Sequence, residues 1–246
     1  MTKALLLFDI DGTLLSTRGM GMRAIRRAFG QLFGDGLNWE GINPGGSLDP
    51  LIFAEAARIN GIKNADVHHA RFRDVYIQEL TNNLKTNRHR VEVMPGVHVL
   101  LAHLRERISE HGDAVLGLLT GNYAKAVPMK LATIGVDVSW FTVTAFGDEG
   151  AERAELVRLA LDRYQLLTDE PADPGRVAVI GDTPRDVACA HAHGCVAFAV
   201  ATGGYSVEEL AACGADVVLK DLSDPTPLID FIDGKTQTES RRVTES

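Results

Sequence analysis

Short, mainly apolar runs recur along the chain. They occupy residues 3–8, 114–119, 141–146, 176–180, 196–200 and 216–219. Apolar runs of this length are typical of strands in a parallel sheet that helices cover on both faces. From residue 97 on, stretches with helical spacing of apolar residues separate the runs; they cover residues 97–108, 124–134, 151–164, 184–193 and 207–212. This alternation predicts an α/β fold with a doubly wound, mainly parallel sheet.

One long segment near the N-terminus breaks the alternation. Helical spacing appears over residues 20–33, 50–60 and 65–84, and no strand pattern lies among them. This predicts an all-helical domain, residues 16–90, inserted into a core formed by residues 1–15 and 91–233. The polar segment 234–246 is predicted to be a disordered tail.

Composition narrows the class of protein. The chain has 246 residues, 45% of them hydrophobic, and a formal net charge of −8. This charge argues against a surface for nucleic acid or anionic membranes. No apolar run approaches the ~20 residues of a membrane span, and three sparse cysteines suit a reducing compartment. We therefore expect a cytoplasmic protein that binds neither nucleic acid nor membranes; whether it is a monomer or homodimer is left open by the sequence.

Polar residues follow the apolar runs that begin at residues 3, 114 and 176. The three segments read "LLLFDIDGTLL", "LLTGN" and "VIGDTPRD". Because ligand sites in open parallel sheets form beside the carboxyl ends of the strands, we expect these groups at one edge. Clustered carboxylates repel one another, and a hard divalent cation such as Mg²⁺ relieves this repulsion. The acids concerned are Asp9, Asp11, Asp182 and Asp186.

The motifs "DIDGT" (9–13), "LTGN" (119–122) and "GDTPRD" (181–186), in this order, resemble those of the haloacid dehalogenase superfamily of phosphatases. The resemblance implies a Rossmann-like core with a helical cap, as in the phosphoglycolate phosphatase-like branch. It implies that Asp9 is the nucleophile that becomes an aspartyl phosphate and that Asp11 is the general acid/base. Thr120, with the N–H of Gly121, would hold the transferring phosphoryl group.

The resemblance also implies the remaining site residues. Asp182 would bind Mg²⁺ with Asp186 as its supporting partner, although Asp186 could instead cap the helix after Pro184. The expected metal-binding set is Asp9, Asp11, Asp182 and Asp186. The expected substrate-binding set in the core is Gly12, Thr13, Gly121 and Asn122.

One family element is missing at its usual place. The superfamily has a lysine that neutralises the nucleophile and the phosphate, but the corresponding stretch, "FGDEGAERAELVRLAL", contains no lysine. Arg153 stands near the expected position, and Lys130 is the alternative. We favour Arg153, which opens the helix before the strand at 176–180, although arginine and lysine are not equivalent.

The loop "GINPGGSLDP" (41–50) lies between two helices of the predicted cap. It is similar to the glycine-rich cap loop of phosphoglycolate phosphatases and β-phosphoglucomutases. That similarity implies that Gly46, Ser47 and Asp49 contact the substrate when the cap closes. The alternative is a simple turn between two helices.

The sequence thus predicts a Mg²⁺-dependent phosphatase for a small phosphomonoester, with a phosphoglycolate-like substrate as one candidate. A 2-haloacid dehalogenase is an alternative, but that branch uses a metal-free site and lacks the second acid of the first motif. A phosphosugar mutase is another alternative within phosphoryl transfer. A non-enzymatic binding domain is disfavoured because Asp9 and Asp182 are both present.

Overall fold

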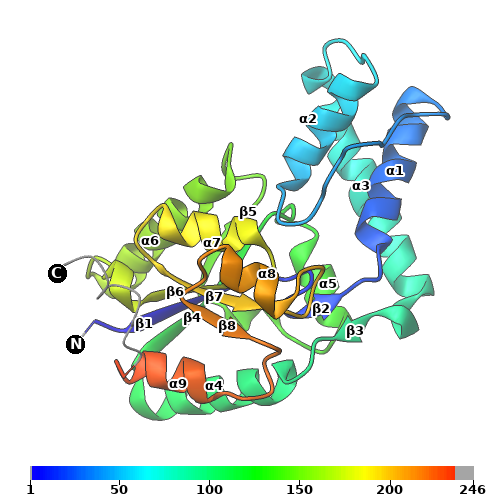
Figure 1. The fold of residues 1–246 in the computed structure, drawn as a ribbon. Helices are drawn as coiled ribbons and strands as arrows, with labels where there is room; N and C mark the ends of the chain where they lie inside the picture. The colour runs from blue at the N-terminus through cyan, green and yellow to red at the C-terminus, as the bar shows by residue number, and fades with distance from the viewer. Residues whose placement is uncertain (1, 236–246) are drawn as a thin grey trace.

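The computed structural model describes residues 2–235 of the chain. Its centre is a parallel six-stranded sheet with the strand order β5-β4-β1-β6-β7-β8 (Figure 1). The strands are β1 (Ala4–Phe8), β4 (Ala114–Thr120), β5 (Val143–Phe146), β6 (Val177–Gly181), β7 (Val196–Val200) and β8 (Val217–Leu219). This confirms the predicted fold class, and it places β1 between the strands that carry the second and third motifs.

Helices cover both faces of the sheet because alternate residues of the central strands face opposite ways. Leu6 and Phe8 of β1 belong to one apolar cluster, whereas Leu5 and Leu7 belong to another. The first cluster includes residues of α4 (Val97–His111), α5 (Val127–Thr133) and α9 (Thr226–Ile232). The second includes residues of α6 (Arg153–Thr168), α7 (Pro184–His191) and α8 (Val207–Ala212). These buried runs explain why the strands lack polar alternation.

Three further helices form a separate layer beyond one end of the sheet, at the upper right of Figure 1. They are α1 (Met20–Phe33), α2 (Asp49–Ile59) and α3 (Asp66–Thr86). Phe29 lies at the centre of their apolar cluster, with its ring centroid 5.4 Å from that of Phe53 and 5.5 Å from that of Phe72. We call these three helices and the loops between them the cap.

The chain enters and leaves the cap through two adjacent short strands, β2 (Leu15–Ser16) and β3 (Glu92–Val93). They pair antiparallel, Leu15 with Val93 and Ser16 with Glu92. An ion pair between Arg18 and Glu92 lies beside this connection. The two chain segments that join the core to the cap thus lie side by side, close to residues 15 and 91. The domain boundaries at these residues stay a prediction.

The cap loop is docked closely against the core. The N–H of Asp49 donates to the carbonyl of Gly121 (2.7 Å), and a Cβ atom on Gly121 would lie 2.0 Å from the carbonyl oxygen of Ser47. Tyr123, from the core segment after β4, is fully buried within the apolar cluster of the cap. Backbone approach at Gly121 and insertion of Tyr123 therefore fix the cap against the sheet edge.

A few elements differ from the sequence predictions. Three elements were not predicted: β2 and β3, which have two residues each, and α9 after Pro225. The helix predicted from residue 124 begins at Val127, and the helix predicted over 184–193 ends at His191. Of the tail predicted to be disordered (234–246), Gly234 and Lys235 are described and donate their N–H groups to the carbonyls of Phe231 and Asp230. The rest of this tail lies outside the described residues.

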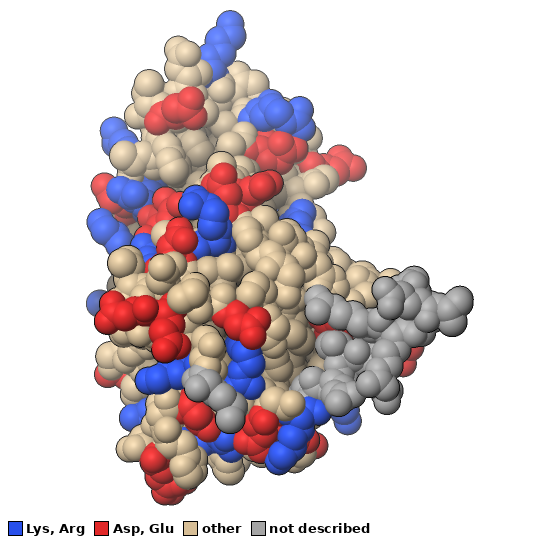
Figure 2. Space-filling view, turned by 90° about the vertical axis from the view of Figure 1, so that its left-hand side faces the viewer, with Lys and Arg blue, Asp and Glu red and all other residues tan. Residues whose placement is uncertain are grey.

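The charges on the face drawn in Figure 2 are mixed, with Lys and Arg side chains interspersed among Asp and Glu side chains. No helix within residues 2–235 combines the length and the apolar character that crossing a membrane requires.

The close approach at Gly121 generates a test of cap docking. Gly121→Ala should displace the cap loop, because its Cβ would overlap the Ser47 carbonyl. We expect hydrogen exchange at the Asp49 amide to accelerate several-fold, since its hydrogen bond to Gly121 contributes about 1 kcal/mol. Gly204→Ala, where a Cβ meets open space, is the matched control. Unchanged exchange in Gly121→Ala would contradict tight docking.

Candidate active site

A cavity of about 280 Å³ lies between the carboxyl ends of the central strands and the cap. The sequence-predicted residues that line it are Asp9, Asp11, Gly12, Gly46, Ser47, Asp49, Thr120, Gly121, Asn122, Lys130, Arg153 and Asp182. Thr13 and Asp186 lie behind the wall, in contact with residues that line it. The structure therefore brings all three motifs and the cap loop to one place.

The first motif extends β1 and then turns sharply. The N–H of Asp9 still donates to the carbonyl of Ile180 (2.8 Å), as in the ladder with β6. Gly12 then adopts a φ of 86° and donates its N–H to Leu15 (2.8 Å), which closes the turn. Thr202 donates its hydroxyl to the Gly12 carbonyl (2.5 Å), so a loop after β7 braces the turn.

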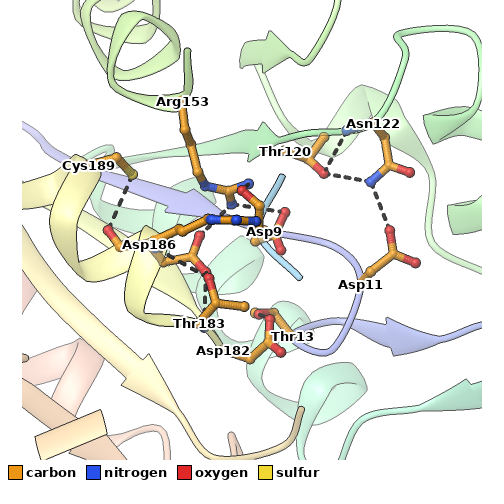
Figure 3. A network of polar contacts seen from close by, with 12 residues as sticks. Asp9, Asp11, Thr13, Thr120, Asn122, Arg153, Asp182, Thr183, Asp186 and Cys189 are labelled. Atoms are coloured by element: carbon orange, nitrogen blue, oxygen red, sulfur yellow. Dashed lines mark hydrogen bonds and ion pairs between the residues drawn. The ribbon is translucent and has the colours of Figure 1, made fainter. Parts of the chain in front are cut away.

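Three buried carboxyl groups meet at the strand ends. Asp9, Asp182 and Asp186 each offer an oxygen, and these oxygens lie within 4.8 Å of one another. Asp11 is not in this group, because its carboxylate turns toward Asn122 (Figure 3). The structure thus brings together three of the four residues predicted to bind metal, and a ligand role for the Asp11 side chain stays a prediction.

Asp182 is the carboxyl group in this cluster whose negative charge has the fewest stabilising contacts. Among the described residues it has no ion-pair partner within 4 Å, and Thr13 donates its hydroxyl to it from 3.4 Å. Burial and the charges of Asp9 and Asp186 raise the pKa of Asp182 to about 8. Burial likewise raises the pKa of Asp9 to about 6. A hard divalent cation fits this all-oxygen, electron-rich set, because it would stabilise the ionised carboxylates.

Arg153 is the cation of the acid cluster. Its guanidinium is buried, forms an ion pair with Asp186 and lies 3.3 Å from Asp9. Burial opposes its charge, but the carboxylates of Asp186 and Asp9 more than offset this and raise the pKa of Arg153 above its ordinary value. A second nitrogen donates to the Gly46 carbonyl (3.3 Å). Arg153 therefore links the predicted nucleophile to the cap loop.

Lys130 serves a different carboxylate. Its ammonium is almost fully buried, lies 2.5 Å from Asp11 Oδ2 and also contacts the side-chain oxygen of Asn122. The Asn122 amide donates to Asp11 (2.8 Å) and to Thr120 Oγ1 (2.7 Å). Since Thr120 Oγ1 accepts this bond, its own proton is free to be donated into the cavity. The two candidate cations thus divide between the two acids of the first motif.

Asp186 also begins a helix. Thr183 and Asp186 form a reciprocal capping box at α7, in which Asp186 Oδ2 accepts the Thr183 N–H (3.0 Å) and hydroxyl (2.6 Å). Its Oδ1 faces Arg153. The capping role considered from the sequence is therefore observed together with membership of the carboxyl cluster.

The cap loop completes the cavity wall. A Cβ atom on Gly46 would lie 2.5 Å from Thr183 Oγ1, and Arg185 donates to the Gly45 carbonyl (2.5 Å). Asp49 is buried, and its Oδ2 accepts the N–H of Tyr123 (3.0 Å). Burial raises the pKa of Asp49 to about 6, so it remains mostly ionised at neutral pH.

Several residues at the site were not singled out from the sequence. Thr183 could have been found from its place before Pro with an acid three residues on, which is a capping-box pattern. Tyr76, Tyr123, Arg185 and Thr202 carry no local signal, because their contacts join segments far apart in the chain.

Comparison with known proteins places this arrangement in a family. Residues 6–200 match the family model described as haloacid dehalogenase-like hydrolase. A phosphoglycolate phosphatase of Synechococcus elongatus is 33% identical over 134 residues, which cover 54% of this chain and 58% of that protein. The aligned region thus spans less than two thirds of the curated relative.

Solved structures share the fold. A hydrolase from Pseudomonas syringae aligns over 93% of this chain and 98% of its own, with a TM-score of 0.69 and 20% identity. The CbbY protein of Rhodobacter sphaeroides, solved in complex with phosphate, aligns over 91% of this chain and 96% of its own, with a TM-score of 0.69 and 22% identity. The family match covers most of the described residues and contains all three motifs. The chain therefore belongs to the haloacid dehalogenase-like hydrolases.

Proposed function

We propose that the protein is a Mg²⁺-dependent phosphatase that hydrolyses a small phosphomonoester through an aspartyl phosphate on Asp9. The observation that carries this proposal is the pairing of two acids on one cavity, one beside Arg153 and the other beside Lys130. Phosphoglycolate, the substrate in the name of the Synechococcus relative, is one candidate.

Asp9 supplies the nucleophile in this mechanism. Its carboxylate attacks phosphorus, and the P–O bond to the leaving alcohol breaks. Arg153 lies 3.3 Å from Asp9 and reduces the repulsion between the anionic nucleophile and the anionic phosphate. Thr120 donates its hydroxyl proton to the phosphoryl group, beside the N–H of Gly121.

Asp11 moves the protons. In its protonated form it donates to the leaving oxygen, and as a carboxylate it then takes a proton from the water that hydrolyses the aspartyl phosphate. Lys130 and Asn122 hold the carboxyl group through Oδ2. The cap excludes bulk water from this exchange.

Asp9 and Asp182 would hold the Mg²⁺ ion, with Asp186 beside them. The ion supplies positive charge that stabilises the transferring phosphoryl group. The same carboxyl cluster disfavours the metal-free dehalogenase alternative, because among the described residues Arg153 pairs with two of the three buried acids and leaves Asp182 without an ion-pair partner. We also propose that the substrate is a small soluble molecule and that the enzyme works in the cytoplasm.

The proposal is tested first by metal removal. We expect hydrolysis of an aryl phosphate with Mg²⁺, loss of activity in excess chelator, and recovery when the metal is restored. Asp9→Asn should abolish turnover, since an amide cannot replace the carboxylate nucleophile. Undiminished hydrolysis in chelator, or by Asp9→Asn, would overturn the proposed mechanism.

The raised pKa values generate a stability test. In the folded state the pKa values of Asp9 and Asp182 are about 6 and about 8, above the ordinary value of 3.8. At a pH between 3.8 and these values, the metal-free folded state therefore binds more protons than the unfolded chain. Its stability should therefore fall as pH rises from about 4 to about 8. Mg²⁺ binds the ionised carboxylates, so it should raise Tm more at about pH 8 than at about pH 5.

Thermal unfolding with and without Mg²⁺ measures both trends. Asp182→Asn is the informative variant, and it should lose most of the Mg²⁺-induced increase in Tm. An equal Mg²⁺ effect at both pH values, or an undiminished effect in Asp182→Asn, would place the metal elsewhere.

The division of the two cations gives a kinetic test. Arg153→Ala should slow formation of the phosphoenzyme by on the order of 10²–10³, because the cation beside the nucleophile is lost. Lys130→Ala acts through Asp11, so its cost should be larger for an alkyl phosphate, whose alcohol needs a proton, than for an aryl phosphate. Rapid-quench kinetics on both esters measures the difference, with circular dichroism as a check of folding. Equal losses on both esters in Lys130→Ala would contradict a role through Asp11.

A further inference from the structure

Asp49 places a buried negative charge on the part of the cavity wall that the cap provides. It is the first residue of α2 and lines the cavity together with Asp11 and Lys130. In the proposed mechanism the phosphate lies at Asp9 and Thr120, so a leaving group that extends toward the cap would meet the part of the wall that holds Asp49. This residue is therefore in a position to select among leaving groups.

Within residues 2–235, the hydrogen bonds to the Asp49 side chain use only Oδ2. Oδ2 accepts the backbone N–H of Tyr123 (3.0 Å) and the hydroxyl of Tyr76 (3.4 Å). These contacts hold the carboxyl group in one orientation and leave Oδ1 to the cavity that the residue lines. The exposed oxygen of an ionised carboxylate accepts hydrogen bonds and donates none.

The nearest cation does not cancel this charge. The ammonium of Lys130 attracts Asp49 across the cavity, but it is in direct contact with Asp11 and Asn122. Among the described residues Asp49 forms no ion pair within 4 Å, although sixteen ion pairs are present there. Asp49 is thus an anionic acceptor that, among the described residues, has no cation of its own.

Polar and apolar side chains share the rest of the lining, and Arg18, its third cation beside Lys130 and Arg153, forms an ion pair with Glu92. Met22 and Ile25 of α1 and Ile52 of α2 line the cavity, whose volume of about 280 Å³ must also hold the phosphate group. That volume lies at the lower limit of typical ligand cavities, ~300 Å³. The remaining space suits a short leaving group with a hydrogen-bond donor directed at Asp49.

We propose that this enzyme selects phosphomonoesters of short, uncharged alcohols that carry a further hydroxyl group, and that Asp49 rejects leaving groups bearing a carboxylate. The inference rests on the proposed phosphatase function and names its substrate class. A hydroxyl donates to Asp49 Oδ1, whereas a carboxylate offers no proton and is repelled by the like charge of the buried Asp49.

Matched pairs of esters test the proposal with the intact enzyme and Mg²⁺. 2-Hydroxyethyl phosphate is compared with phosphoglycolate, and glycerol 1-phosphate with 3-phosphoglycerate; each pair differs in a hydroxymethyl group against a carboxylate. We expect kcat/KM of the wild-type enzyme to favour the hydroxyl member by on the order of 10-fold or more. A wild-type enzyme that prefers the carboxylate members overturns the proposal.

Asp49→Asn changes the charge while keeping the shape. Its amide oxygen can still accept the Tyr123 N–H, and its NH₂ group then faces the cavity as a donor. The preference for the hydroxyl member should fall by on the order of 10-fold or reverse. Asp49→Ala, which removes the charge without adding a donor, should also weaken the preference. An unchanged ratio in both variants overturns the role of Asp49.

Glu55→Gln is the matched control. Glu55 is an exposed acid of the same helix, paired with Arg58 and absent from the wall of this cavity. Its removal changes the net charge equally and should leave the ratio within each ester pair unchanged; a change equal to that of Asp49→Asn overturns the local role of Asp49. Hydrolysis of an aryl phosphate separates the two claims. Its absence overturns the phosphatase function, and its presence with a carboxylate preference overturns only the substrate class.

Discussion

The repulsion among buried carboxylates at the carboxyl ends of β1 and β6 is the constraint around which this site is organised. Asp9, Asp182 and Asp186 converge there, and within the described residues Arg153 is the one side chain that forms ion pairs with them. Arg153 leaves Asp182 without an ion-pair partner there, and burial, together with the charges of Asp9 and Asp186, raises the pKa of Asp182. The proposed Mg²⁺ ion would satisfy this demand, and an anionic substrate could then approach an otherwise anionic edge.

The same contacts make the cap part of the chemistry. Arg153 touches both Asp9 and the Gly46 carbonyl, and Asp49 takes the N–H of Tyr123 next to the segment that carries Thr120 and Asn122. The position of the cap is therefore coupled through a few bonds to the surroundings of Asp9 and to the segment after β4. Displacement of the loop would alter the contacts of Arg153 with Asp9 as well as admit water.

The sheet and the convergence of the three motifs could be predicted from the sequence, because both follow from local patterns in the chain. The apolar run before Asp9 identifies a buried strand, and parallel strands bring their ends together whatever lies between them. The separate partners of Arg153 and Lys130 could not be predicted, since they depend on how α5 and α6 approach the turn after β1. The insertion of Tyr123 into the cap cluster was equally hidden, because a lone aromatic after "LTGN" reads as ordinary packing.

The central claim is that Asp9 carries the phosphoryl group during turnover. The most direct measurement is acid quenching of the enzyme within milliseconds of mixing with Mg²⁺ and an aryl phosphate. Borohydride reduction then converts an aspartyl phosphate to homoserine, which mass spectrometry of peptides locates. The account predicts homoserine at position 9 in the working enzyme. Homoserine at another aspartate, or none at position 9 while turnover is under way, would contradict it.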